Sequence, residues 1–223
     1  MQPSAISIAV SETQRVSGLL LVPSDARACY VLAHGAGAGM THPFMANVAD
    51  GLAQRRIATL RYQFPYMERG SKRPDAPPLA HATVHVAVAE AARQLPKLPL
   101  IAGGKSFGGR MTSQAQAIAP LAGVRGLAFL GFPLHPPKQP SATRADHLRN
   151  VEVPMLFLQG TRDELADLSL LKPVIEELGA RARLCTFADA DHSFHVPARS
   201  GRKDSDVLAE LLDAFATWCD ELH

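Results

Sequence analysis

The sequence lacks the features that mark membrane-spanning or nucleic-acid-binding proteins. No apolar stretch approaches the roughly 20 residues that a transmembrane helix needs, because Gly, Pro or a charged residue interrupts every run. Lys and Arg total 23 against 21 Asp and Glu, so the net charge of +2 provides no basic surface for a phosphate backbone. We therefore expect neither a membrane nor a nucleic acid as a partner.

Cysteine is also scarce, and no export signal is visible. Cys29, Cys185 and Cys219 are an odd number, each in an apolar context and without a C-x-x-C pair, so we expect reduced, buried thiols. The start from Met1 to Ser4 carries no positive segment followed by an apolar one, which a secretory signal requires. A cytoplasmic location follows as an expectation.

The chain is rich in short apolar runs, which alternate with segments whose apolar residues have helical spacing. With 47% apolar and 20% charged residues, we expect one globular domain over residues 1–223. Helical spacing is clearest at residues 83–95 and 207–222. Eight strands are predicted, at residues 6–10, 19–22, 29–33, 57–61, 98–102, 124–130, 154–158 and 183–187.

The spacing of these strands predicts an α/β fold with helices on both faces of a mostly parallel sheet. The first two strands lie too close together for a crossover helix, so they form an antiparallel hairpin. Residues 132–153, between the sixth and seventh strands, leave room for a short helix near 142–148 but not for a lid domain. An open site is expected.

Ligands bind at the carboxyl ends of strands in such sheets, and the strand ending at residue 102 is followed by a G-x-S-x-G pattern. Gly104, Ser106 and Gly108 form this pattern, which is typical of a nucleophile elbow in which the glycines leave space for a sharp turn. Lys105 also suggests a phosphate-binding P-loop, but Pro99 occupies the position of the first glycine of that motif.

A second loop, His34 followed by Gly-Ala-Gly-Ala-Gly, comes directly after the third strand. In the elbow interpretation the backbone N–H of Ala36 supplies one oxyanion donor, and the N–H of Phe107 supplies the other. A dinucleotide-binding loop from Gly35 to Gly39 is the alternative, with Arg61 on the ribose phosphate of NADP. In that motif, G-x-G-x-x-G, Met40 would occupy the third glycine position, where close packing of helix on strand favours Gly or Ala.

An acid and a histidine follow the last two strands, in the hydrolase order Ser, Asp, His. Asp163 is preferred to Glu164 because it is nearer the strand end, although Asp163 could simply cap a helix. His192 and His195 are both candidates for the general base that activates Ser106, and loop length favours His192.

No metal or cofactor site is expected. His81 and His85 lack the glutamate of a zinc-binding H-E-x-x-H motif, and Asp189, Asp191 and His192 would need an ordered loop to converge on a cation. The basic segment 67–78 could line the mouth of the site or be a solvated connector.

At these same residues the sequence resembles the α/β-hydrolase superfamily across nearly its whole length, through HGAGAG, GGKSFGGR, QGTRDE and DHSF. The segment LRYQFPY is similar to the subgroup containing the testis-expressed 30 and NSL-complex subunit 3 proteins and their dienelactone-hydrolase-like relatives. The resemblance implies Ser106 as nucleophile, His192 as base and Asp163 as its orienter, with oxyanion donors at Ala36 and Phe107. Ser106 replaces the cysteine of dienelactone hydrolases proper.

The expected function is a serine carboxylesterase that cleaves small soluble esters through an acyl-enzyme, without a cofactor. Arg61 and Tyr62 are candidate substrate contacts, or they hold the neighbouring loop. Because some members of the subgroup belong to regulatory complexes, a non-enzymatic scaffold that retains the fold is an alternative. The NADP-binding protein remains another, and the oligomeric state is left open.

Overall fold

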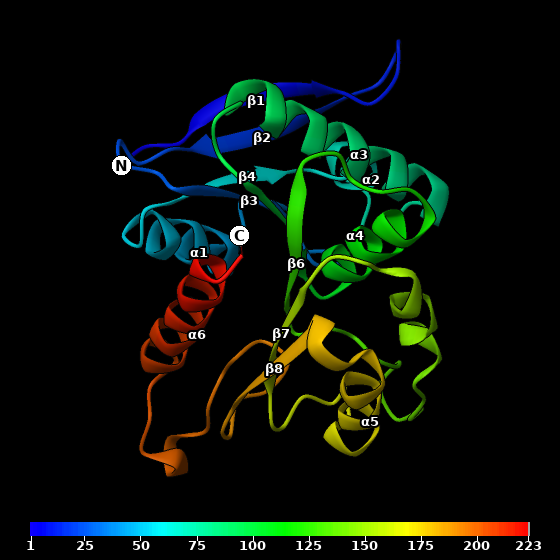
Figure 1. The fold of residues 1–223 in the computed structure, drawn as a ribbon, viewed down its shortest axis with the longest axis vertical. Coiled ribbons are helices and arrows are strands. Elements are labelled where there is room, and N and C mark those ends of the chain that lie inside the picture. The colour runs from blue at the N-terminus through cyan, green and yellow to red at the C-terminus, as the bar shows by residue number, and fades with distance from the viewer. Residues whose placement is uncertain (223) are drawn as a thin grey trace.

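One sheet runs through the protein, and the computed structural model describes it within residues 1–222. Its strands follow the order β1-β2-β4-β3-β5-β6-β7-β8 (Figure 1). The second strand pairs antiparallel with both of its neighbours, and all other pairs are parallel. The strands are β1 (Ser4–Ala9), β2 (Arg15–Leu21), β3 (Ala28–Ala33), β4 (Ile57–Tyr62), β5 (Leu100–Lys105), β6 (Val124–Leu130), β7 (Met155–Gly160) and β8 (Ala182–Phe187).

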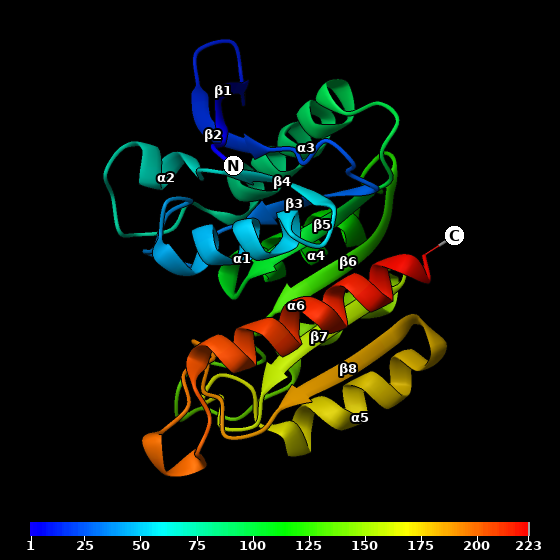
Figure 2. The same cartoon turned by 90° about the vertical axis from the view of Figure 1, so that its left-hand side faces the viewer.

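Helices cover both faces of this sheet (Figures 1 and 2). The helices α1 and α6 pack on one face, and α3, α4 and α5 pack on the other, each face with its own apolar core. The α-helices are α1 (Pro43–Ala53), α2 (Pro65–Glu68), α3 (Pro77–Gln94), α4 (Phe107–Ile118), α5 (Leu168–Leu178) and α6 (Asp204–Asp220). The short 3-10 helices are η1 (Thr143–Asn150), η2 (Gly179–Arg181) and η3 (Ala198–Ser200).

The burial of the strands explains their sequences. Strands β3, β4 and β7 are buried along their whole length, as continuous apolar runs covered on both faces should be. The sheet edges β1 and β8 carry exposed residues instead. The predicted antiparallel hairpin is confirmed, because Ser4 lies opposite Leu20 and Ala9 lies opposite Arg15.

The segment that the sequence predicts as a loop, residues 67–78, is helical at both of its ends. Residues 65–68 form α2, and α3 begins at Pro77, six residues before its predicted start. Proline suits the first position of a helix because its missing N–H has no partner to lose there. Because of its prolines, the sequence does not reveal the first turns of α3 as helical.

The connection between β6 and β7 is short, as predicted. Within it, η1 is the one helical element, close to the predicted helix at 142–148. Among residues 1–222, none of the helices combines the length and apolar character required to cross a bilayer. The three cysteines are unpaired, with Cys29 and Cys219 buried and Cys185 partly exposed on the edge strand β8, where the prediction of a core thiol is wrong.

Candidate active site

The elbow pattern forms a sharp turn between β5 and α4, and Ser106 lies at its apex. Ser106 has φ +49°, a left-handed conformation that is costly for a residue with a side chain. A Cβ at Gly108 would lie 2.5 Å from the carbonyl oxygen of His34, and one at Gly104 would overlap the carbonyl of Ala33. The two glycines thus allow the turn to pass close to the end of β3.

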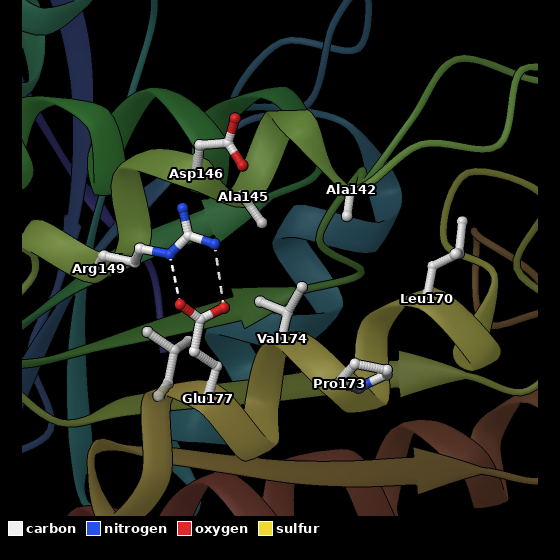
Figure 3. Close-up of a pocket in the computed structure, with 9 residues that line it drawn as sticks. Ala142, Ala145, Asp146, Arg149, Leu170, Pro173, Val174 and Glu177 are labelled. Carbon is white, nitrogen blue, oxygen red and sulfur yellow. Dashed lines mark hydrogen bonds and ion pairs between the residues drawn. The ribbon is translucent and has the colours of Figure 1, made fainter.

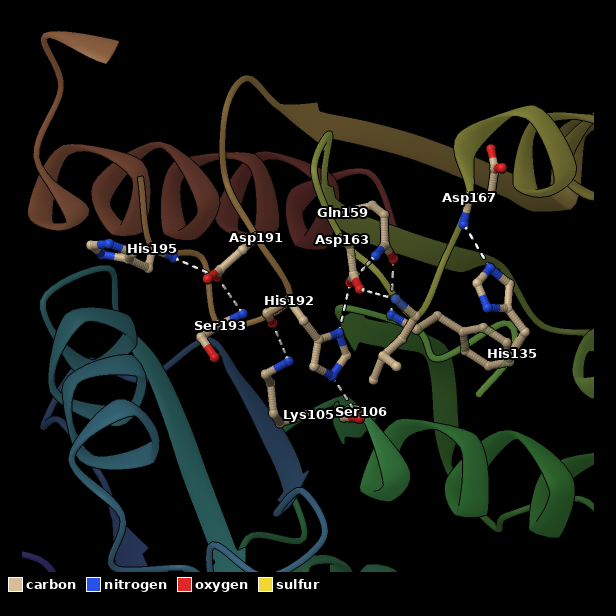
Figure 4. Close-up of polar contacts among 12 residues, drawn as sticks. Lys105, Ser106, His135, Gln159, Asp163, Asp167, Asp191, His192, Ser193 and His195 are labelled. Atoms are coloured by element: carbon tan, nitrogen blue, oxygen red, sulfur yellow. Dashed lines mark hydrogen bonds and ion pairs between the residues drawn. The ribbon is translucent and has the colours of Figure 1, made fainter. Parts of the chain in front are cut away.

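Three side chains from different strand ends form one hydrogen-bonded chain (Figure 4). The Oγ of Ser106 lies 2.8 Å from Nε2 of His192, and Nδ1 of His192 lies 2.7 Å from Oδ2 of Asp163. Because a carboxylate accepts hydrogen bonds, Nδ1 carries the proton and Nε2 is left as the acceptor for the serine hydroxyl. The Asp163 side chain is fully buried, and that of His192 is 23% exposed.

Asp163 is held by two further donors. The side-chain amide of Gln159 donates to Oδ2 at 2.5 Å, and the N–H of Leu165 donates to Oδ1 at 2.8 Å. The carbonyl oxygen of the Gln159 side chain accepts from the N–H of Phe132 at 2.9 Å. The fully buried Gln159 thus fixes the acid relative to the end of β6, a role that sequence reasoning missed.

The loop from His34 to Met40 lies beside Ser106 and is held by the segment that follows β4. The imidazole of His34 bridges the N–H of Phe64 at 3.0 Å and the carbonyl of Gly35 at 2.8 Å. Burial lowers the pKa of His34 to about 4, so it is a neutral bridge at pH 7. The hydroxyl of Tyr66 accepts from the N–H of Gly37 at 3.2 Å.

Two more bonds hold the far end of this loop. The N–H of Met40 donates to Oε1 of Gln63 at 2.8 Å, and the carbonyl of Met40 accepts from Arg61 at 3.3 Å. Within residues 1–222, the N–H groups of Ala36 and Phe107 have no hydrogen-bond partner. Phe107 opens α4, whose N-terminal end carries partial positive charge.

Arg61 and Tyr62 do not line the pocket at Ser106, and of the two predicted roles the structure shows the second for Arg61, which holds the loop rather than contacting substrate. Arg61 is 4% exposed and lies on the α1 side of β4, where it holds Met40. Tyr62 is 1% exposed and belongs to the core on the opposite face. Successive residues of a strand point to opposite faces, and both faces are covered here. The burial of Arg61 also keeps it from the ribose phosphate that the NADP alternative requires.

The basic segment 67–78 holds the loop indirectly. Asp75 accepts from the N–H of Tyr66 at 2.8 Å, and Arg69 pairs with the same carboxylate at 2.7 Å. These bonds fix the backbone of Tyr66, whose hydroxyl supports Gly37. The segment does not line the pocket at Ser106.

A pocket of about 420 Å³ opens directly over Ser106. Its wall combines the glycine-rich loop, the first turn of α1 and the loop that carries His192, and it is mostly apolar. The lining residues are Gly35, Ala36, Ala38, His42, Phe44, Met45, Lys105, Ser106, Leu165, His192 and Ser193.

A family profile described as an alpha/beta hydrolase domain matches residues 26–220. The chain belongs to this family. Solved structures agree on the fold of this α/β-hydrolase. A lidless serine hydrolase from Xanthomonas campestris is 19% identical, with a TM-score of 0.75 over 98% of this chain and 95% of the other.

Two further solved structures share the fold at similar distance. The dienelactone hydrolase from Anabaena variabilis is 22% identical, with a TM-score of 0.74 over 99% of this chain and 96% of that one. The esterase domain of a Rhodothermus marinus protein is 15% identical, with a TM-score of 0.73 over 98% of each chain. The fold of this α/β-hydrolase is therefore shown, with no lid domain between β6 and β7.

The α/β-hydrolase contains a second serine–histidine pair that lacks the other parts of the site. The Oγ of Ser113, in the middle of α4, lies 2.7 Å from Nε2 of His147, and it also reaches the carbonyl of Arg110 at 3.0 Å. Burial, with the nearby charge of Arg110, lowers the pKa of His147 to about 4. Ser113 is fully buried, and within residues 1–222 no carboxylate is hydrogen-bonded to His147. This pair packs α4 against η1.

The other candidate base, His195, is directed elsewhere. Its Nδ1 pairs with the Asp204 carboxylate at 2.9 Å, which raises the pKa of His195. Another cavity, of about 260 Å³, lies between η1 and α5 and is closed on one side by the ion pair of Arg149 with Glu177 (Figure 3). It contains no nucleophile–base pair. Within residues 1–222, no group of three or more metal-binding side chains converges.

Proposed function

We propose that this α/β-hydrolase is a serine carboxylic-ester hydrolase that acts through an acyl-enzyme on Ser106. The observation that carries the proposal is the continuous chain from Ser106 through His192 to Asp163, with 2.8 and 2.7 Å steps. A serine hydroxyl is a weak nucleophile until a base takes its proton, and this chain supplies the base already oriented.

In the first step the Oγ of Ser106 attacks the ester carbonyl carbon while Nε2 of His192 takes the hydroxyl proton. The tetrahedral intermediate carries a negative oxygen, which accepts hydrogen bonds from the N–H groups of Ala36 and Phe107. The bond from carbon to the leaving alcohol oxygen then breaks, and His192 returns its proton to that oxygen. The acyl group is left on Ser106.

In the second step water replaces the alcohol. His192 takes a proton from water, whose oxygen attacks the acyl carbon. The bond between that carbon and Oγ of Ser106 then breaks, His192 returns the proton to Oγ, and the carboxylic acid leaves. Asp163 keeps the imidazole in the required tautomer and stabilises its transient positive charge without taking the proton. Every proton transfer in the two steps thus runs between His192, Ser106, the substrate and water.

The pocket supports small, soluble and uncharged esters as substrates. Its volume of about 420 Å³ suits a modest acyl chain, and an open mouth needs no lipid surface to expose it. From the LRYQFPY segment we further propose that the chain belongs to the subgroup of the testis-expressed 30 and NSL-complex subunit 3 proteins and their dienelactone-hydrolase-like relatives. We also propose a cytoplasmic location.

Hydrolysis of short p-nitrophenyl esters by Ser106→Ala tests the proposal, with Ser113→Ala as a matched control at the second serine–histidine pair. We expect Ser106→Ala to lose about three orders of magnitude or more in kcat/KM, and Ser113→Ala to retain the activity of the native chain. Native protein with no esterase activity would favour the scaffold alternative, and equal activity in Ser106→Ala would refute the assignment of the nucleophile.

A further inference from the structure

Lys105, the residue directly before the proposed nucleophile, is tied to the proposed base. Its ammonium Nζ donates to the main-chain carbonyl of His192 at 2.6 Å (Figure 4). The stem of Lys105 runs past Gly35, where a Cβ would lie 3.4 Å from Cγ. A Cβ at Gly131 would lie 3.0 Å from Nζ and 3.4 Å from the His192 ring, so that position leaves the space that the lysine and histidine occupy.

The loop that carries His192 is attached to the strand of the acid by backbone bonds. The N–H of Arg162 donates to the carbonyl of Ala190 at 2.9 Å, and that of Thr161 donates to the carbonyl of Phe187 at 3.0 Å. No backbone-to-backbone bond of this kind joins the described loop residues to β5. Within the described chain, residues 188–196 are joined to residues 100–109 by two hydrogen bonds, the one from Lys105 and the one between His192 and Ser106 itself.

The groups around the ammonium of Lys105 leave its charge available to strengthen the bond to the His192 carbonyl. Nζ lies 5.6 Å from the centre of the Phe194 ring, and no carboxylate of residues 1–222 forms an ion pair with it. Burial lowers the pKa of Lys105 to about 8, although the negative charges of Asp163 and Asp191 act in the opposite direction. A bond from a charged donor to a carbonyl is stronger than a neutral one.

We propose that Lys105 is a positioning residue that holds His192 in register with Ser106 by gripping the carbonyl of the histidine from the nucleophile's own strand. The inference rests on the proposed function. Without the lysine, Asp163 would still orient the imidazole, but no bond from β5 would hold the backbone of His192. Small misplacement of a catalytic group is costly.

This arrangement predicts a pH dependence. The titratable groups that face the ammonium are His192, Asp163 and Asp191. Below about pH 8 the ammonium keeps its charge, and above that pH it loses a proton and the charge-assisted bond weakens. We therefore expect kcat to fall on the alkaline side in the native enzyme.

Lys105→Met and Lys105→Arg test the proposal, with Lys97→Met, at an exposed site before β5, as the control. We expect Lys105→Met to lower kcat about ten- to hundredfold, with KM changed by less than about threefold. Its residual activity should lack the alkaline fall above pH 8. Lys105→Arg keeps the charge, so its alkaline fall should move to higher pH. Lys97→Met should match the native profile.

Native-like kcat in Lys105→Met, or the same alkaline fall in all variants, would overturn the proposal. If Lys105→Met does not fold, the profile of Lys105→Arg decides alone. If the native protein neither hydrolyses esters nor reacts with a fluorophosphonate, the proposed function has failed instead. The tether is then tested by NMR, because the low-field proton of His192 Nδ1 should be sharp in native protein and broadened in Lys105→Met. An unchanged signal would refute it.

Discussion

The two sides of the site are held by different physical means. On one side, Gln159 and Asp163 orient His192 through a short chain of bonds to a buried carboxylate. On the other side, β4 and the segment after it hold the loop from His34 to Met40 through four separate bonds. These bonds involve the neutral imidazole of the loop's own His34, a phenol, an amide and the guanidinium of Arg61. The imidazole of His192 is oriented by a single carboxylate, so the base side acts as a series at Asp163, although Leu165 also holds that carboxylate and Lys105 holds the His192 carbonyl. The loop side is a parallel set.

A series fails at any link, whereas a parallel set loses only one contribution at a time. Bonds to a buried charge are also stronger than neutral ones, and leaving that charge without a partner is costly. Single substitutions on the base side should therefore cost more activity than those on the loop side, even where the substituted residues are alike.

Asp163→Asn should give the largest effect. The asparagine keeps the size of the side chain but can donate to Nδ1, which favours the tautomer with a proton on Nε2, so the histidine no longer accepts from Ser106. We expect kcat to fall roughly 10⁴-fold, and the melting temperature to fall as well, because the same Asn amide would face the Gln159 donor that now meets Oδ2. Steady-state kinetics and a melting curve measure the two quantities. Loss of less than about tenfold would mean that the series does not depend on Asp163.

A matched pair of glutamines compares the two sides directly. Gln159→Leu removes a donor from Asp163 and an acceptor from Phe132, and Gln63→Leu removes one acceptor from the N–H of Met40. We expect kcat to fall about ten- to hundredfold in Gln159→Leu and less than about fivefold in Gln63→Leu. Equal losses would contradict the distinction between series and parallel support.

The smallest effect concerns the neutral His34 and is read from stability. Burial lowers the pKa of both His34 and His147 to about 4 in the folded chain, below the value of about 6.5 for an unfolded histidine. The unfolded chain therefore binds more protons between these values, and the stability that is complete above pH 6.5 is lost as the pH falls toward 4.

Urea unfolding at pH 7, 6 and 5 measures this loss. We expect the free energy of unfolding to decrease over that range, and both His147→Gln and His34→Gln to reduce the decrease. His85, whose pKa is also lowered, adds to the decrease, and His195, whose pKa is raised, opposes it. A decrease that is unchanged in His34→Gln would show that the loop side does not rely on a neutral imidazole.

The positions of Ser106, Asp163 and His192 could be predicted because parallel strands bring their carboxyl ends to one edge of a sheet. The pattern of apolar runs located each strand, and the residue after it was then a candidate. Of the two roles predicted for Arg61 and Tyr62, contact with substrate was wrong because of the same strand pattern that located the other residues. They still belong to β4, so both side chains are enclosed by the layers on either face.

The supporting residues could not be predicted from motifs. Gln159 lies inside a strand that is buried on both faces, where the sequence gives no sign that its amide meets Asp163. For Lys105 the sequence suggests only a phosphate-binding pattern, although its ammonium joins the end of β5 to the loop of His192, far apart in the chain. Such contacts depend on side-chain direction and tertiary distance, which neither periodicity nor spacing encodes.

The central claim is that Ser106 is an activated nucleophile in a formed site. Treatment with a fluorophosphonate, followed by mass spectrometry of the intact chain and its peptides, tests this most directly. We expect one adduct per chain, located on Ser106, none in Ser106→Ala, and unchanged labelling in Ser113→Ala. A folded native protein that takes up no label, or a Ser106→Ala variant that takes up as much as the native chain, would contradict it.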